Sequence, residues 1–313
     1  MKKISLVICV YNEEDNIIPL TESIISSLAA FDFEAIFVND GSTDSTRKKI
    51  LSINDNRFRL VSLTKNFGQS SALQAGIDTA EGEYIVTLDG DLQNDPSDIP
   101  MMLEKAESEG WDVVAGIRAN RKDGIILRKI PSRIANSIIR KTTEVRIKDY
   151  GCTLKVFRSE MAKSIKIYGE LHRFIPVLVA LEGGTITQVD VKHHPRIHGF
   201  SKYGISRTMK VVSDLLVMLF IKKYLQKPMH LFGGLGGISI LIGIVINLYL
   251  LILKILGNDI WGKPIIILGM IFLLVGIQLI TFGLMAEIQM RTYFESQNKK
   301  PYRIREIETT GQK

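Results

Sequence analysis

The sequence predicts an α/β domain with a mostly parallel sheet, followed by amphipathic interface helices and two transmembrane helices. Three observations carry this prediction: apolar runs of strand length recur in the first half, polar clusters directly follow three of them, and two long segments near the C-terminus lack charged residues. The chain has 313 residues, more than the ~250–300 at which a single core stops growing. Its mean hydropathy of +0.14 is high for a soluble protein. We therefore expect one unit in water and another in a membrane.

Continuous apolar runs predict the strands of the sheet. Residues 4–10 (ISLVICV) form the first run, and residues 34–38 (EAIFV) form the second. Runs that are apolar throughout and separated by helical stretches, such as 15–30, are typical of parallel strands buried on both faces. Three further strands are predicted at 58–63, 84–88 and 112–116.

Composition and charge exclude several classes of protein. Charged residues make up 23% and hydrophobic residues 46%, which excludes a disordered chain and a collagen. The two cysteines, Cys9 and Cys152, have no C-x-x-C spacing, which argues against a zinc site or a disulfide framework. The net charge of +7 suits nucleic acid, an anionic membrane or a phosphorylated substrate, and charge alone does not choose among them.

Two segments predict membrane spans, 231–253 and 264–286. Neither contains a charged residue, and about 23 residues in a helix cross a hydrocarbon core of ~30 Å. The alternative is a buried helical hairpin of a soluble protein. Basic residues flank the outer ends of both spans, so the positive-inside rule places both termini in the cytoplasm. These flanking residues are Lys222, Lys223, Lys227, Arg291, Lys299, Lys300, Arg303 and Arg305.

Two basic amphipathic segments are expected to lie in the membrane interface. They are a juxtamembrane helix at 205–228 and a segment at 125–141, which Pro131 interrupts. The alternative for each is an ordinary amphipathic helix packed on a core. The predicted organisation is thus a cytoplasmic domain at 1–204, the juxtamembrane helix, the two spans, and a basic cytoplasmic tail at 287–313.

Polar clusters follow three predicted strands and indicate one site. They are Tyr11-Asn12-Glu13, Asn39-Asp40-Gly41-Ser42 and Asp89-Gly90-Asp91. In open α/β sheets, ligands bind beyond the carboxyl ends of the strands, where these clusters meet. There is no G-x-G-x-x-G after the first strand and no P-loop motif, so neither a dinucleotide fold nor a P-loop is supported.

The cluster at Asp89 has the composition of a metal site. Asp89 and Asp91 supply two carboxylates with a small residue between them, and Gln93 adds an amide oxygen. Such hard oxygen ligands suit Mg²⁺ or Mn²⁺. The alternative for a lone D-x-D pattern is a solvated turn.

With these motifs in view, the sequence resembles the family 2, GT-A-fold glycosyltransferases of the polyisoprenyl-phosphate group. This group includes bacterial undecaprenyl-phosphate sugar transferases and dolichol-phosphate mannose synthase. The resemblance implies a Rossmann-like nucleotide-sugar-binding domain. The motifs that carry it are VICVYNEEDN at 7–16, VNDGSTDST at 38–46, NFGQSSALQAG at 66–76, LDGDLQNDP at 88–96, DYGCTLKVF at 149–157, LHRFIP at 171–176 and RIHGFSKY at 196–203, together with the two C-terminal spans.

The resemblance also implies residues that bind the nucleotide sugar. Asp40 is expected to accept hydrogen bonds from the base or the ribose, and Cys9 stands where the family usually has proline. Asp89, Asp91 and Gln93 would bind the metal and, through it, the diphosphate. Arg196 and Lys202 would close over the phosphates, because arginine suits oxyanions. The full implied set is Cys9, Tyr11, Glu13, Val38, Asp40, Asp89, Gly90, Asp91, Arg196 and Lys202.

The acceptor and the catalytic residues are implied in the same way. Arg118, Arg128 and Ser201 would hold the acceptor phosphate, with solvated surface charge as the alternative for the arginines. Asp149, together with Asp91, is the expected catalytic residue. A structural cap or turn is the rival role for Asp149, because some relatives place their key aspartate nearer to the position of Cys152.

The expected activity is an inverting transfer of one hexose, with UDP-glucose as the example donor, to a polyisoprenyl phosphate at the cytoplasmic face of the inner membrane. The lipid phosphate is already an anionic nucleophile and needs no general base. The product would supply cell-envelope glycans; a homo-oligomer and a flippase are expected partners, and nucleic acid is not. One alternative is a processive polysaccharide synthase, although the chain has no Q-x-x-R-W motif. The other is a non-catalytic membrane-anchored sugar-nucleotide-binding protein.

Overall fold

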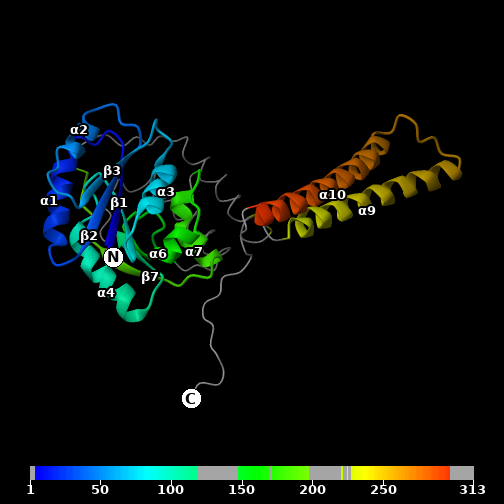
Figure 1. Cartoon of the computed structure of the whole chain (residues 1–313). Coiled ribbons are helices and arrows are strands. Elements are labelled where there is room, and N and C mark those ends of the chain that lie inside the picture. Colours follow the sequence, from blue (N-terminus) through cyan, green and yellow to red (C-terminus); the bar gives the residue numbers. More distant parts are fainter. Residues whose placement is uncertain are drawn as a thin grey trace, which may run out of the picture. The chain divides into compact units, whose positions relative to one another are not determined.

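A computed structural model describes residues 4–118, 147–169, 171–196, 220, 224 and 227–296. The chain divides into two compact units, Met1–Leu215 and Leu216–Lys313. The first unit holds a sheet with its covering helices, and the second holds a pair of long helices (Figure 1).

The sheet of the first unit has seven strands in the order β3-β2-β1-β4-β6-β5-β7. β6 is antiparallel to both of its neighbours, β4 and β5, and every other pair is parallel. The prediction of a mostly parallel sheet is therefore confirmed. The strands are β1 (Ile4–Val10), β2 (Phe33–Asn39), β3 (Phe58–Ser62), β4 (Tyr84–Asp89), β5 (Val113–Arg118), β6 (Lys155–Arg158) and β7 (Ile186–Val191).

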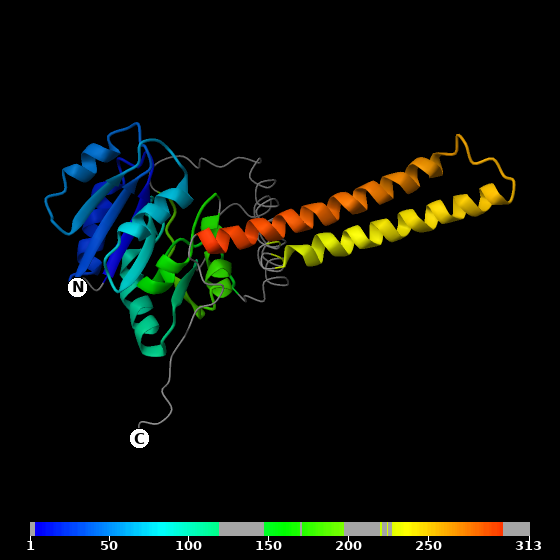
Figure 2. The same cartoon turned by 45° about the vertical axis from the view of Figure 1, so that its right-hand side comes forward.

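Helices cover both faces of this sheet (Figures 1 and 2). α1 and α4 pack on the face that carries Leu6 and Ile8 of β1. α3 packs on the opposite face, where its Gly76 lies directly against Val7. The helical elements of this unit are α1 (Ile17–Ser27), α2 (Thr46–Leu51), α3 (Gln69–Thr79), η1 (Pro96–Asp98), α4 (Ile99–Glu109), α6 (Ser159–Ser164), η2 (Leu171–Phe174) and α7 (Ile175–Leu181).

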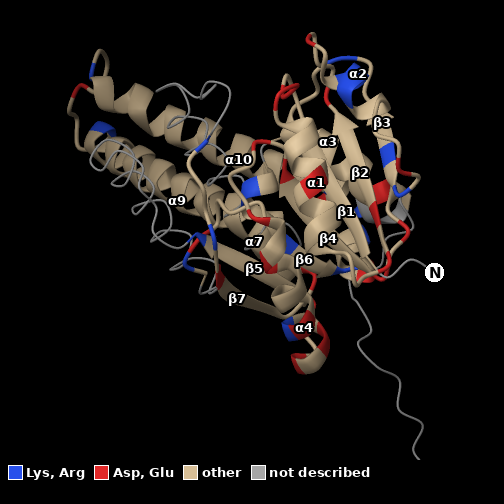
Figure 3. Cartoon of the chain, turned by 90° about the vertical axis from the view of Figure 1, so that its left-hand side faces the viewer, with Lys and Arg blue, Asp and Glu red and all other residues tan. Residues whose placement is uncertain are grey.

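The second unit contains α9 (Pro228–Ile255) and α10 (Pro264–Ser296). Their segments Pro228–Ile255 and Pro264–Thr292 have mean hydropathies of 2.5 and 2.7 and are long enough to cross a membrane. Charged side chains are rare on both helices, whereas they are frequent on the sheet domain (Figure 3). Both helices contain the predicted spans.

Small residues bring α9 and α10 close together. A Cβ built on Gly236 would lie 2.7 Å from the carbonyl oxygen of Gly276, and one built on Gly276 would lie 2.7 Å from that of Gly236. The hydroxyl of Ser239 also donates to the carbonyl oxygen of Phe272 at 2.7 Å. Such close contacts are a common way for helices to associate in lipid, where apolar side chains gain little from leaving the solvent.

Several predicted segments lie outside the described residues. They include the basic segment at 125–141 and nearly all of the juxtamembrane helix at 205–228. The first part of the predicted tail at 287–313 is helical in the structure, because α10 continues to Ser296. The apolar run ends before this point, but no proline or glycine stops the helix there.

Candidate functional site

The loops that follow β1 and β2 are bound to each other by hydrogen bonds. The N–H of Asn12 donates to Ser42 Oγ at 2.9 Å, and Asn12 Oδ1 accepts from the N–H of Thr43 at 2.8 Å. Asn12 has a φ of 53°, a left-handed conformation that asparagine tolerates. The N–H of Glu13 donates to Thr46 Oγ1 at 2.9 Å. The first two polar clusters predicted from the sequence are thus joined at one edge of the sheet.

Asp40 fastens the loop that precedes α3. Its Oδ1 accepts from the N–H of Phe67 at 2.7 Å, and its Oδ2 accepts from the N–H of Gly68 at 2.9 Å. The neighbouring Gly41 has a φ of +70°, and a Cβ there would lie 2.5 Å from the carbonyl carbon of Lys65. The resemblance implied that Asp40 binds the base or the ribose; the described contacts show that it also positions this loop.

Three other expected nucleotide contacts have different environments. Val38 is fully buried, with its Cγ2 3.0 Å from a Cβ built on Gly76, so its side chain belongs to the core. Tyr11 is half-buried at the edge of the sheet. Cys9 is half-buried and pairs with Asp89 across β1 and β4. Burial, reinforced by the charges of Asp89 and Asp40, raises the pKa of the Cys9 thiol, so it stays protonated.

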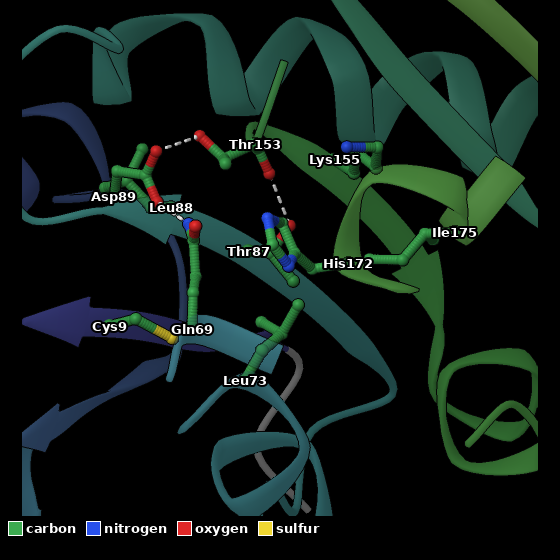
Figure 4. Close-up of a pocket in the computed structure, with 10 residues that line it drawn as sticks. All are labelled: Cys9, Gln69, Leu73, Thr87, Leu88, Asp89, Thr153, Lys155, His172 and Ile175. Atoms are coloured by element: carbon green, nitrogen blue, oxygen red, sulfur yellow. Dashed lines mark hydrogen bonds between the residues drawn. The ribbon is translucent and has the colours of Figure 1, made fainter. Parts of the chain in front are cut away.

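Asp89 is held by neutral donors on both of its oxygens. Gln69 Nε2 donates to Oδ1 at 2.8 Å, and Thr153 Oγ1 donates to Oδ2 at 2.8 Å (Figure 4). Burial and then the charge of Asp91 raise the pKa of Asp89 to about 7. A cation close to Asp89 would lower this pKa again, because it favours the charged form of the carboxylate.

Asp91 is buried with 7% of its surface exposed. Its Oδ2 accepts from Arg196 Nη2 at 2.6 Å, and its Oδ1 accepts from the N–H of Gln93 at 3.2 Å. Between the two aspartates, a Cβ on Gly90 would lie 2.5 Å from Val10 Cγ1, so only glycine fits here without a shift. The structure therefore brings Arg196, which the resemblance assigned to the phosphates, to Asp91.

The residues at this edge fit a divalent cation. Asp91 offers a buried carboxylate and Asp89 a half-buried one, and Gln93 is half-buried beside them. Within the described ranges, no three His, Cys, Asp or Glu side chains are grouped to hold a metal. Ligand oxygens or water would therefore have to complete the coordination shell, as is usual for Mg²⁺.

Arg118 and Asp149 form a bidentate ion pair. Arg118 Nε and Nη2 donate to Oδ2 and Oδ1 of Asp149, each at 2.8 Å. Burial opposes ionisation of Asp149, but hydrogen bonds and charge from Arg118 outweigh it and lower the pKa of Asp149. A Cβ on Gly151 would lie 2.7 Å from Arg118 Nη2, so the glycine leaves room for this pair. The sequence assigned the two residues separate roles, and the structure joins them.

A pocket opens beside Asp89 between the sheet and the helical layer of α3, η2 and α7 (Figure 4). The enclosed space is narrow, with about 20 Å³ open to the centre of a water-sized sphere. Its lining residues are Cys9, Gln69, Leu73, Thr87, Leu88, Asp89, Thr153, Lys155, His172 and Ile175.

Sequence reasoning assigned no role to most of the polar residues in this pocket. The Nδ1 of His172 lies 2.9 Å from Ser70 Oγ, which joins η2 to α3. Lys155 is 2% exposed, and burial lowers the pKa of its ammonium group. The available signal was a lysine at the start of the apolar run KVF. Arg128, Ser201 and Lys202, which the resemblance assigned to the phosphates, lie outside the described residues.

Comparison with known proteins gives close relatives of this chain. Residues 5–165 match the sequence profile of "Glycosyl transferase family 2". The chain is 46% identical to a dodecaprenyl-phosphate galacturonate synthase of Rhizobium johnstonii, over 97% of this chain and 93% of that protein. It is 32% identical to an undecaprenyl-phosphate 4-deoxy-4-formamido-L-arabinose transferase of Proteus mirabilis, over 98% and 94% of the two chains.

A solved structure agrees on the fold. Glucosyl-3-phosphoglycerate synthase of Mycobacterium tuberculosis, solved with Mn²⁺, UDP and glucosyl-3-phosphoglycerate, superposes with a TM-score of 0.54 at 17% identity. The match covers 71% of this chain and 80% of that chain. The fold class predicted from the sequence is thus confirmed. The profile match and the nearly full-length relatives identify this chain as a glycosyltransferase that belongs to glycosyl transferase family 2, with polyprenyl-phosphate sugar transferases as its relatives.

Proposed function

We propose that this chain transfers one sugar from a nucleotide sugar to a polyisoprenyl phosphate, such as undecaprenyl phosphate. One oxygen of the lipid phosphate attacks C1 of the sugar. The bond from C1 to the β-phosphate oxygen breaks, and its electron pair leaves with the nucleoside diphosphate. The lipid phosphate is already ionised, so no proton has to be removed. A single displacement inverts the configuration at C1.

The observation that carries the proposal is the pair of neighbouring carboxylates, half-buried Asp89 and buried Asp91, in a chain whose relatives are named for polyprenyl-phosphate acceptors. These residues would hold Mg²⁺ or Mn²⁺, which offsets the charge on the departing diphosphate. Arg196 already contacts Asp91 and carries a guanidinium that could turn to a phosphate oxygen. Arg118, oriented by Asp149, would hold the acceptor phosphate.

The donor and the membrane arrangement belong to the same proposal. We take the donor to be a UDP-linked hexose or hexose derivative, the class that includes glucose. The relatives differ in their named sugars, galacturonate in one and formamido-arabinose in the other. With both termini in the cytoplasm, the sheet domain would meet the lipid phosphate at the cytoplasmic face of the inner membrane. A homo-oligomer or a flippase as a partner is consistent with this arrangement.

The test of the proposal is a transfer assay with a metal-ligand variant. The purified full chain in detergent receives undecaprenyl phosphate, Mg²⁺ and a panel of nucleotide sugars, and the lipid product is identified by its mass. We expect a lipid-linked monosaccharide from the wild type. Asp91→Asn keeps the shape but removes a ligand charge, so it should lower kcat at least ~10²-fold, and EDTA should do the same.

The matched control is Asp78→Asn, because Asp78 is an exposed aspartate on α3 that contacts Lys166 at 4.0 Å. This variant should keep wild-type activity. Undiminished transfer in EDTA would refute the metal assignment. A product with several sugars on one lipid would favour a processive synthase instead.

A further inference from the structure

Strand β6 begins with a buried lysine that the proposed reaction does not use. Lys155 is 2% exposed, and its ammonium group donates a hydrogen bond to the backbone carbonyl oxygen of Cys152. Asp149 and Asp89 influence it through their charges. Neither comes within 4.0 Å of it in the described part of the chain. A buried charge without an ionic partner is costly, so an anion from outside the chain is the natural partner for this ammonium.

The position of Lys155 tells which part of a donor it could reach. Lys155 pairs with Thr87 across the antiparallel strands β6 and β4, and Thr87 comes two residues before Asp89. At ~3.4 Å per residue, this register is roughly 7 Å deeper in the sheet than Asp89. Lys155 therefore lines the inner part of the pocket, away from Asp89 (Figure 4). Asp91 and Arg196 meet at the outer edge, beyond Asp89.

The diphosphate of a donor would be held at that outer edge. Its charge matches a cation on Asp89 and Asp91 and the guanidinium of Arg196. The pocket is too narrow for a sugar ring or a nucleotide, but a small group such as a carboxylate can enter it. The sugar is the part of the donor that follows the diphosphate, so a substituent of the sugar is the group that can reach into the pocket beside Asp89.

We propose that Lys155 recognises a carboxylate on the donor sugar, so that the donor is a nucleotide-linked uronic acid. This inference rests on the proposed function, since it names the substrate class of the same site. The carboxylate gives the buried ammonium an ionic partner. A neutral sugar of the same shape leaves the ammonium unpaired, which is the situation in which a site rejects a ligand most strongly.

The test compares matched donors in the full chain with undecaprenyl phosphate and Mg²⁺. The pairs are UDP-galacturonate with UDP-galactose, and UDP-glucuronate with UDP-glucose. In at least one pair, the wild type should favour the uronate in kcat/KM by ~10²-fold or more. Lys155→Gln keeps a donor for the Cys152 carbonyl but removes the charge. It should lower kcat/KM for the preferred uronate ~10²-fold and change that for its neutral partner less than ~3-fold.

Lys166→Gln is the matched control, since that lysine side chain is 53% exposed, and it should behave as the wild type. A wild type that favours the neutral sugar in both pairs, or treats both donors of each pair alike, overturns the assignment. So does an equal loss on both donors in Lys155→Gln, which would show a structural role. If the variant does not fold, the wild-type ratio decides. If no nucleotide sugar yields a lipid-linked product, the proposed function itself fails and the assignment fails with it.

Discussion

Glu34 is a buried carboxylate near the start of β2. Its Oε1 accepts from Ser5 Oγ at 2.7 Å and from the N–H of Glu81 at 2.9 Å, and its Oε2 accepts from Arg59 Nη1 at 2.9 Å. Burial opposes ionisation of Glu34, but these hydrogen bonds outweigh it and lower the pKa of Glu34. A lowered pKa in the folded state means that ionised Glu34 stabilises the fold above the unfolded pKa of about 4.3.

We therefore predict that Glu34→Gln lowers the free energy of unfolding at pH 7 by roughly 1–3 kcal/mol. The difference from the wild type should shrink as the pH falls through the folded pKa, where Glu34 becomes protonated and its contribution is lost. Thermal unfolding in detergent at pH 7 and below pH 4 would measure this. Glu81→Gln is the control, because this glutamate contacts Arg59 from a side chain that is 66% exposed. A difference in the free energy of unfolding between Glu34→Gln and the wild type that grows as the pH falls would contradict the prediction.

The ion pair of Arg118 and Asp149 leads to a second prediction at the residue scale. The Nε and Nη2 atoms of Arg118 each donate a hydrogen bond to a different carboxylate oxygen of Asp149. The single ammonium group of a lysine cannot reproduce this paired geometry. We expect Arg118→Lys and Asp149→Asn each to raise the KM for the lipid phosphate more than that for the nucleotide sugar. The double variant should lose little beyond either single one, because both remove the same oriented group. Steady-state kinetics with each substrate varied would test this, and additive losses would indicate separate roles.

Close packing of α9 and α10 gives a prediction at the scale of elements. Gly276→Leu would drive a side chain into the backbone of α9 at Gly236, whereas Gly237 has open space around it. Overpacking of this kind costs ~1–3 kcal/mol. We expect Gly276→Leu to lower the Tm of the full chain in detergent and Gly237→Leu to leave it unchanged. An equal fall in Tm for Gly276→Leu and Gly237→Leu would mean that leucine destabilises the chain by something other than a clash between α9 and α10.

The strands differ in how far the sequence predicts them. β1, β2 and β4 are apolar over nearly their whole length, so their buried positions are visible in the sequence alone. β6 was missed because it is short, begins with Lys155 and ends with the exposed Arg158. Its strand conformation depends on pairing with β4 and β5, which a local pattern does not contain.

The same limit applies to the site. The D-x-D pattern points to Asp89 and Asp91, because both carboxylates lie within three consecutive residues. The donor that holds Asp89 Oδ2, Thr153, is 64 positions away in the chain, and the contact between Ser70 and His172 spans 102 positions. Only the fold brings such residues together, which is why no local pattern pointed to Lys155 or His172.

At the scale of the whole molecule, the proposed function assigns the sheet domain to water and α9 with α10 to lipid. A long polyisoprenyl chain stays in the bilayer, since each buried CH₂ contributes ~0.8 kcal/mol. We predict that a chain ending at Gln226 still binds the nucleotide sugar with Mg²⁺, because the sheet has a core of its own. It should lose most transfer to undecaprenyl phosphate in vesicles and regain part of it with a short, water-soluble prenyl phosphate.

Calorimetry for binding and product mass for transfer would measure the two parts of this prediction. The full chain in the same vesicles is the control. Transfer to the long-chain lipid at the full-length rate by the shortened chain would show that α9 and α10 serve another purpose, such as assembly with a partner.

The place of β6 in the sheet also sets the order in which the site can form during synthesis. β6 lies between β4 and β5 although it follows both along the chain. The hydrogen bond between Thr153 and Asp89 can therefore form only after Thr153 has been made. The pairing of β5 with β7 can form only after β7, which ends at Val191, has been made. α9 begins later, at Pro228. Since ribosomes add roughly 5–20 residues per second and domains fold as they emerge, the last strand is made before the first apolar helix. The carboxylates of the site can thus be in place before α9 and α10 are made.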